Sequence, residues 1–159
     1  MPRVGKIKKR NTIPDPIYQN ALVSLLINRV MRSGKKAVAQ KQVYQALEII
    51  AQKTKEEPLK VLFEALGNIK PFQEVRSRRV GGAAYQVPVP VPEKRQESLA
   101  IRWLILFANK RSNKEYHHFS EKLAAEILDA RQSQGEAVKK KENVHKMAEA
   151  NKAFAHFRW

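Results

Sequence analysis

The sequence predicts a mainly α-helical fold of six helices, with an inserted, projecting two-stranded β-ribbon and a basic, disordered N-terminal arm. Three observations predict it. Apolar residues recur at helical spacing in several segments, two β-prone runs flank Gly81-Gly82, and the first segment is basic without periodicity. A chain of 159 residues suits one domain with a modest core. We expect an arm over 1–14 and one helical domain over 15–159, with the ribbon at about 73–91.

The N-terminal segment is rich in positive charge and has no acidic residue. It lacks the apolar periodicity of a helix or strand, so we expect it to stay disordered until a partner orders it. Its basic residues are Arg3, Lys6, Lys8, Lys9 and Arg10.

Three helices are expected before the ribbon, over about 16–32, 36–54 and 58–69. Asp15-Pro16 predicts the first start, because it offers an N-cap followed by proline at the first helical position. Gly34 is expected to end this helix. In the second helix Val38 belongs to the apolar face, and Pro58 opens the third.

The ribbon is predicted from its turn and its edge. Gly81-Gly82 suits a tight hairpin turn because both central residues need a positive φ. Pro88, Pro90 and Pro92 recur with a period of two, so their missing N–H groups lie on one edge, which cannot accept another strand. A lone two-stranded ribbon is marginal in water, and it would project as a finger. The first strand carries Arg76, Arg78 and Arg79.

Three further helices are expected after the ribbon. The apolar run 99–107 predicts a central core helix, and a fifth helix starting near Phe119 would end at Gly135. The last segment, 136–159, is helical in propensity but poor in large apolar residues. We expect it to dock on the domain through a narrow stripe formed by Met147, Phe154 and Phe157.

The charge of the chain points to nucleic acid. Lys and Arg number 31 against 15 Asp and Glu, a formal net charge of +16 that an anionic partner would neutralise. The positive charge is segregated, since ten basic residues and one acid precede Gln42, whereas 42–69 holds three lysines and four glutamates. Segregated charge is typical of phosphate recognition. No secretory signal or membrane-spanning run is evident, so we expect an intracellular protein with no membrane partner.

Other kinds of site find little support. Gly34-Lys35-Lys36 lacks the earlier glycine and the Ser or Thr of a nucleotide-binding loop. Lys35 and Lys36 instead suit either a phosphate contact at a helix start or a solvated basic turn. The chain has no cysteine, and adjacent histidines His117-His118 point about 100° apart on a helix. We therefore expect no metal, no cofactor and no catalytic residue.

Two features of the sequence can each be interpreted in two ways. Tyr85, near the hairpin tip, could stack on a base or pack across the ribbon against the first strand. Lys139, Lys140 and Lys141 could form a solvated helix face, although their basic surroundings, which include Arg131, favour RNA contact.

Several long motifs resemble a known family. They are Asn20 to Lys36 with Gly34-Lys35-Lys36, Ser77-Arg78-Arg79-Val80-Gly81-Gly82, Tyr85-Gln86-Val87-Pro88-Val89, Ala100-Ile101-Arg102-Trp103, and His145 to Trp159. Together they are similar to the bacterial-type seventh protein of the small ribosomal subunit, over a match that runs from Asp15 to Trp159.

The resemblance implies a helical domain that binds the 3′ major domain of the small-subunit RNA early and nucleates assembly of the subunit head. It implies a position near exit-site tRNA and upstream messenger, beside the eleventh protein of the platform, in a bacterial cytoplasmic or an organellar ribosome. By matching motif, the rRNA contacts would be the arm residues together with Lys35, Lys36, Arg76, Arg78, Arg79, Arg95 and Arg102. The tRNA- and messenger-proximal residues would be Gly81, Gly82, Ala83, Tyr85, Lys139, Lys140 and Lys141.

Two parts of the sequence depart from the family pattern, Gln42 and the segment 115–120.

Two other functions are alternatives to a ribosomal one. A free regulator could repress a messenger through the same basic surface, and an RNA-modifying enzyme would require a catalytic pocket that the sequence does not indicate.

Overall fold

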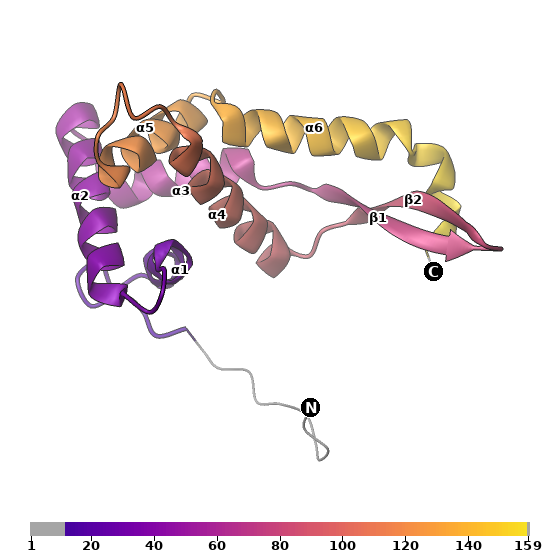
Figure 1. Ribbon diagram of the computed structural model, residues 1–159, viewed down its shortest axis with the longest axis horizontal. Helices are drawn as coiled ribbons and strands as arrows, with labels where there is room; N and C mark the ends of the chain where they lie inside the picture. The colour runs from indigo at the N-terminus through magenta and orange to yellow at the C-terminus, as the bar shows by residue number, and fades with distance from the viewer. Residues whose placement is uncertain (1–11, 159) are drawn as a thin grey trace, which may run out of the picture.

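The computed structural model describes residues 12–158, which form a helical body with a projecting β-hairpin (Figure 1). The elements are α1 Ala21–Val30, α2 Lys36–Thr54, α3 Pro58–Ile69, β1 Gln73–Val80, β2 Ala83–Pro90, α4 Glu93–Lys110, α5 Phe119–Arg131, α6 Glu136–Ala150 and a 3-10 helix, η1, Lys152–Phe157. The mainly helical fold class with an inserted ribbon is confirmed. The expected disorder of the arm concerns residues outside the described range, apart from its last three.

The core is built around α5, which packs against α2, α3 and α4. Its inward face holds Leu123, Ala124 and Ile127, all fully buried. The small alanine lets neighbouring helices approach, while the two larger side chains supply most of the buried apolar area. The predicted core helix is longer than its apolar run, because Glu93–Lys110 extends into charged residues at both ends.

The first helix begins later than predicted. Asp15 does cap a turn, accepting hydrogen bonds from the backbone N–H groups of Ile17 and Tyr18 at 3.2 Å each. Gln19 then takes a φ of +48°, which breaks the helical path. Asn20 is the true N-cap, since its Oδ1 accepts from Leu22 N at 2.8 Å. The helix ends at Val30, and Gly34, with φ +73°, lies within the turn that follows.

Asp15 has a second role, as a tertiary anchor. It is 3% exposed, and the Tyr44 hydroxyl on α2 donates to its Oδ1 at 2.7 Å. Burial, followed by this hydrogen bond, raises the pKa of Tyr44 to about 12, so the phenol remains a donor throughout the physiological range. The segment that leads into the arm therefore leaves the helical body at a fixed point on α2.

Two further sequence predictions are wrong. Val38 is 58% exposed and does not belong to the core face of α2. Gly135 does not cap the end of α5, which finishes at Arg131; it is the residue before α6. Its φ is +93°, and a Cβ at this position would lie 3.2 Å from Glu126 Oε1, so glycine is required by conformation and by space.

A buried carboxylate joins three helices next to this glycine. Glu126 on α5 is 1% exposed and accepts from Ala137 N at the start of α6, at 3.1 Å, and from Arg111 Nε at 2.8 Å. Arg111 follows α4 and also pairs with Asp129. Burial alone would lower the pKa of Arg111, but the hydrogen bonds that it donates to the carboxylates of Asp129 and Glu126 raise it above its usual value. The network fixes where α6 begins.

The hairpin has the predicted turn. Val80 pairs with Ala83 across Gly81 and Gly82, whose φ values are +58° and +90°. The hairpin is not a free finger, however, because α6 packs along it and η1 folds onto its outer part (Figure 1). Tyr85 contacts the rings of Phe154 and Phe157 on η1, each with a centroid separation of 5.2 Å.

The terminal segment is docked by two of the three predicted residues, Phe154 and Phe157, whose rings contact Tyr85. Met147 is 48% exposed and lies outside the docking stripe. The buried side chains of α6 are Ala137, Val138 and Ala148, and the helix ends at Ala150, before the aromatic residues. Small buried residues bring α6 close to its neighbours, and the aromatic contacts are left to η1.

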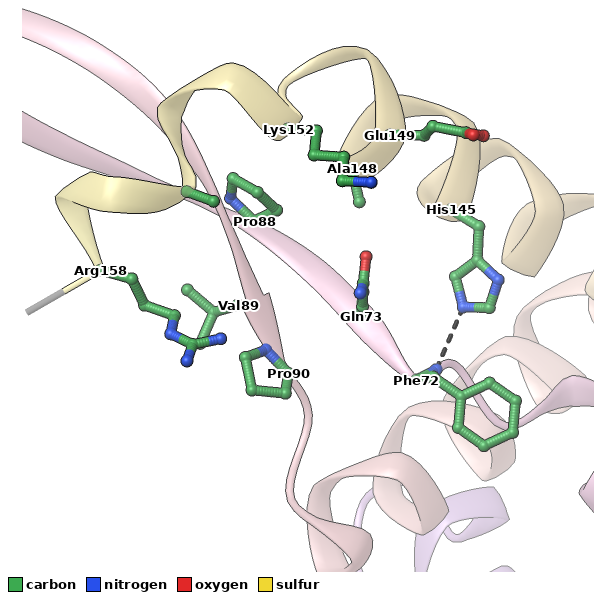
Figure 2. Close-up of a pocket in the computed structure, with 11 residues that line it drawn as sticks. Phe72, Gln73, Pro88, Val89, Pro90, His145, Ala148, Glu149, Lys152 and Arg158 are labelled. Atoms are coloured by element: carbon green, nitrogen blue, oxygen red, sulfur yellow. Dashed lines mark hydrogen bonds between the residues drawn. The ribbon is translucent and has the colours of Figure 1, made fainter.

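A groove separates the hairpin from the C-terminal segment (Figure 2). At its inner end His145 on α6 accepts a hydrogen bond through Nε2 from the backbone N–H of Phe72, at 3.0 Å. Burial, and to a lesser extent Lys141, lowers the pKa of His145 below its ordinary value. A neutral imidazole is required, because a protonated ring has no acceptor nitrogen.

We predict that Phe154→Ala releases η1 from the hairpin without unfolding the body. The change removes the ring contact with Tyr85 and that with Phe157, and such aromatic pairs contribute about 0.5–1.5 kcal/mol each. Amide exchange should accelerate in η1 and near Tyr85 while α5 remains protected. Phe63→Ala, at an exposed position on α3, is the control, and equal acceleration in both variants would contradict the prediction.

We also predict that acid weakens the docking of α6 at His145. Since the folded pKa is lowered, this contact stabilises fully above the unfolded pKa of about 6.5 and is lost as pH falls through the lower folded value. Protection of the Phe72 amide should therefore decline on acidification, after correction for intrinsic exchange. His145→Gln retains an acceptor that does not titrate, so a matching decline in that variant would refute the assignment.

Candidate nucleic-acid interface

The first basic cluster lies at the turn between α1 and α2. Lys35 is the N-cap residue of α2 and Lys36 its first residue, both exposed, and within residues 12–158 neither has an ion-pair partner. Positive φ values at Ser33 and Gly34 make the turn compact. Arg29 and Arg32, at the end of α1 and just beyond it, are exposed on the same connection. The turn gathers four cations beside the start of a helix, where anions are stabilised.

The second group is a row on α4. Arg95 and Arg102 are seven residues apart, and Asn109 continues the spacing, so the three lie along one face. Ile105 and Asn109 line a cavity together with Arg32 and Lys35. This face of α4 therefore borders the α1–α2 turn, and the two basic groups form one surface.

A buried carboxylate joins the row to the ribbon. Glu74 on β1 is 9% exposed and pairs with Arg76 at 2.6 Å and with Arg95 at 2.9 Å. Burial opposes ionisation, but hydrogen bonds from Arg95 and then Arg76 outweigh it and lower the pKa of Glu74. Both arginine side chains remain about half exposed, so Glu74 holds two arginines without covering them.

The ribbon divides its remaining arginines between two faces. Arg78 lies opposite Tyr85 in the register, whereas Arg79 lies opposite Ala84 and projects from the other side. At the tip, Gly81, Gly82 and Ala83 are exposed. The ring of Tyr85 packs against Phe154 and Phe157 on η1, a contact that neither sequence interpretation predicted.

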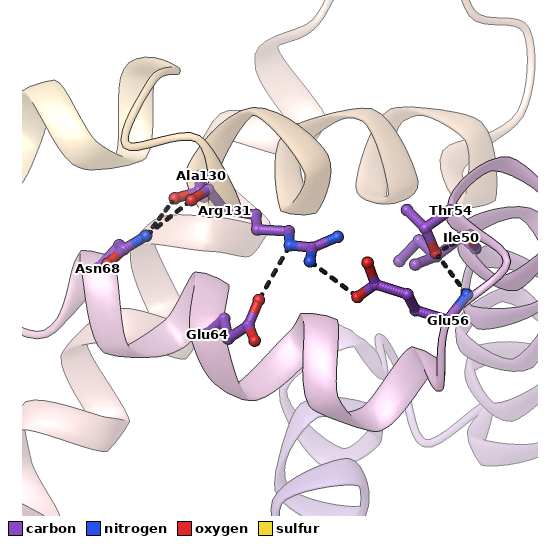
Figure 3. A network of polar contacts seen from close by, with 7 residues as sticks. All are labelled: Ile50, Thr54, Glu56, Glu64, Asn68, Ala130 and Arg131. Carbon is purple, nitrogen blue, oxygen red and sulfur yellow. Dashed lines mark hydrogen bonds and ion pairs between the residues drawn. The ribbon is translucent and has the colours of Figure 1, made fainter.

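Some cations are committed to acids. Arg131 donates to Glu64 through Nε at 2.9 Å and to Glu56 at 2.7 Å (Figure 3). The same end of α5 is held by Asn68, whose Nδ2 donates to the carbonyl oxygens of Ala130 and Arg131. Arg131 is therefore paired with two acids, and it does not supply unpaired positive charge to the surroundings of Lys139, Lys140 and Lys141 as the sequence interpretation assumed.

The lysines of α6 are separated from the ribbon tip. Lys139, Lys140 and Lys141 lie in the first two turns, at the end attached to α5, whereas the tip lies beside η1 (Figure 1). Lys139 also pairs with Glu136 at 2.8 Å. The structure does not bring these lysines and Gly81-Gly82 into one site.

Sequence reasoning missed four exposed cations. Arg29 and Arg32 lie at the α1–α2 connection, and Lys152 and Arg158 lie in or after η1. The last two line the groove of Figure 2, next to the hairpin. Both lie in the C-terminal motif, His145 to Trp159, that resembles the family, so their positive charge within that motif could have identified them. The predicted contacts Arg3, Lys6, Lys8, Lys9 and Arg10 lie outside the described residues.

Two other kinds of feature, a metal-binding cluster and a membrane-spanning helix, are not found in residues 12–158. No group of three or more His, Cys, Asp or Glu side chains could hold a metal ion there. In the same range, no helix has the length and apolarity needed to cross a bilayer.

Comparison with known proteins agrees with the basic surface. The family model described as ribosomal protein S7p/S5e matches residues 2–152. The chain belongs to the ribosomal protein S7p/S5e family. Proteins called small ribosomal subunit protein uS7 from Sulfurihydrogenibium sp., Caldicellulosiruptor bescii and Thermoanaerobacter pseudethanolicus are 55%, 57% and 57% identical to it, each over the full length of both chains. The resemblance found in the sequence is confirmed.

Membership of the S7p/S5e family makes this chain a ribosomal protein, a component of a ribonucleoprotein. In this S7p/S5e protein, Lys35, Lys36, Arg95 and Arg102 lie on connected elements, and Arg76 on the ribbon is joined to Arg95 through Glu74. The geometry suits positioning by phosphate contacts, which need exposed cations on a rigid scaffold.

We predict that Arg102→Ala weakens RNA binding and reduces the slope of log K against log salt by about 0.7–0.9. Arg131→Ala removes the same charge from a side chain held by Glu56 and Glu64, and should leave the slope unchanged. Binding to small-subunit RNA between about 50 and 200 mM salt measures both. Equal slopes in the two variants would show that α4 does not contact phosphate.

Proposed function

We propose that this protein is a structural constituent of the small ribosomal subunit that binds the 3′ major domain of its RNA directly and early, and so nucleates assembly of the head. Its relatives carry the name of a small-subunit protein, and those named above are bacterial, which favours a ribosome in the bacterial cytoplasm over an organellar one.

One observation carries the RNA-binding part of the proposal. Exposed cations without ion-pair partners in residues 12–158, such as Lys35, Lys36 and Arg102, lie on the α1–α2 turn and α4. Arg131, by contrast, is paired with Glu56, just before α3, and with Glu64 on α3. A protein that used charge only for solubility would have no reason to distribute it in this way. A cluster of exposed cations on one surface is the electrostatic footprint of nucleic-acid binding.

The scaffold explains how such a surface can nucleate assembly. Helices α1, α2 and α4 meet in one core, and Glu74 attaches the ribbon to α4 through Arg95. A rigid array of phosphate contacts pays little ordering cost on binding and can hold separate RNA segments in a fixed relation. Arm residues would then wrap RNA that the body has already positioned.

The hairpin suits a different task. Its tip, Gly81-Gly82-Ala83, carries no large side chain, so a backbone or a sugar can approach closely. We assign the tip to the exit-site tRNA and the upstream messenger, with Arg79 as its nearest exposed cation. The C-terminal segment beside it would meet the eleventh protein of the platform.

A second candidate function uses the same surface. A free form of the protein could bind and repress a messenger that imitates the rRNA site, because phosphate contacts read shape more than sequence. Co-sedimentation with small subunits after a high-salt wash separates a resident constituent from a regulator.

Footprinting of the purified protein on naked small-subunit RNA tests the main proposal. Protection should fall within the 3′ major domain and should persist, though weaker, for protein lacking residues 1–13. A footprint that lay in another domain, or that required other ribosomal proteins, would overturn the assignment as a primary binder.

We predict that shortening the hairpin affects function more than stability. Replacing 79–84 by a plain tight turn retains Tyr85 and its contacts with η1, so thermal stability should stay within about 1–2 kcal/mol of the parent. Subunits should still assemble but mishandle exit-site tRNA or reading frame. A large fall in melting temperature would show instead that the tip supports the core.

A further inference from the structure

A small pocket lies between the α1–α2 turn, α4 and the start of α5. Its volume is about 250 Å³, and its walls are apolar: Val30, Val38, Ala39, Ile105 and Phe119. Pockets for small molecules usually exceed about 300 Å³, so this one suits a single planar group. Val38 is 58% exposed here, an unusual position for a branched apolar residue in the midst of basic side chains.

The rim of the pocket is positively charged. Arg32 and Lys35 line it directly, and Arg29 and Lys36 are exposed on the same connection. The residues that line the pocket include no acid. An apolar cavity with a cationic mouth is complementary to a nucleotide, which carries a flat base next to a phosphate.

Two amides add polar groups suited to a base edge. Gln42 Oε1 accepts from Ser120 N at 3.1 Å, and within residues 12–158 its Nε2 has no partner. Asn109 Nδ2 donates to the Ile105 carbonyl at 2.9 Å, and over the same range its Oδ1 has none. The pocket therefore offers one unused donor and one unused acceptor, both on side chains whose other end is already held.

We propose that this pocket binds one unpaired nucleobase of the ribosomal RNA, with the adjoining phosphate against Lys35 and Arg32; the proposal rests on the RNA-binding function proposed above. The base would pack against Val38 and Phe119, and its edge would meet Gln42 and Asn109. Sequence-specific RNA recognition usually targets such unstacked bases. The site would add base recognition to an interface that otherwise reads phosphates.

The test fills the pocket without changing charge. Val38→Phe enlarges an exposed side chain at the wall, so we expect the fold to be preserved, and circular dichroism and thermal melting check this. Phe63→Trp, on α3, enlarges another exposed side chain away from the pocket and serves as control. The probe is the purified 3′ major domain RNA. For Val38→Phe we expect about tenfold weaker binding with an unchanged salt slope, because no phosphate contact is lost.

Chemical probing identifies the base. With the parent and with Phe63→Trp, one unpaired nucleotide should be protected at its Watson–Crick edge, and Val38→Phe should expose it while backbone protection elsewhere is retained. Unchanged affinity and base protection in Val38→Phe would overturn the pocket proposal alone. Normal RNA binding with failed entry into subunits would assign the pocket to a protein side chain. Absence of any footprint from the parent would overturn RNA binding itself.

Discussion

The buried ion pair between Glu126 and Arg111 is the contact on which the distal half of the molecule depends. Glu126 accepts from the first turn of α6, and Arg111 fixes the end of α4, so one carboxylate sets the direction in which α6 leaves the core. α6 in turn carries η1 to the hairpin. Removing one partner of such a pair costs about 3–5 kcal/mol, because the other charge is left buried.

Acidic residues organise the positive charge of this protein. Glu74 orients Arg76 and Arg95 at the base of the ribbon, and Glu56 and Glu64 hold Arg131 on the side of α3. The few carboxylates thus decide which cations stay available. A net charge of +16 opposes compaction, and the ion pairs neutralise part of this charge, so the remaining repulsion lies on the surface that an RNA would cover.

Local signals in the sequence predicted the elements whose ends are decided locally. Both α2 and α3 have the expected bounds, and the Gly81-Gly82 turn has the expected conformation. The start of the first helix was predicted wrongly from Asp15. This residue satisfies the rules for an N-cap, but it also accepts a hydrogen bond from Tyr44, 29 positions away. A pairwise contact over that separation leaves no periodic signal.

The candidate site was predictable in outline for a similar reason. Charge segregation is visible in one dimension, so Lys35, Lys36 and the ribbon arginines could be identified. Whether a cation is paired depends on which acid faces it in space. The sequence therefore could not show that Arg131 is paired with Glu56 and Glu64. The exposure of Val38 likewise follows from the packing of α2 against α1, α3 and α5, which spacing within α2 alone does not encode.

The cover over the hairpin has a consequence for the order of synthesis. Tyr85 is translated 69 positions before Phe154, and at about 5–20 residues per second its aromatic partners follow about 3–14 s later. Until then η1 cannot cover the ribbon. The helices that carry the main basic surface, α1, α2 and α4, are all translated before Phe154. The nascent chain can thus acquire its RNA-facing body first and complete its distal end only as termination approaches.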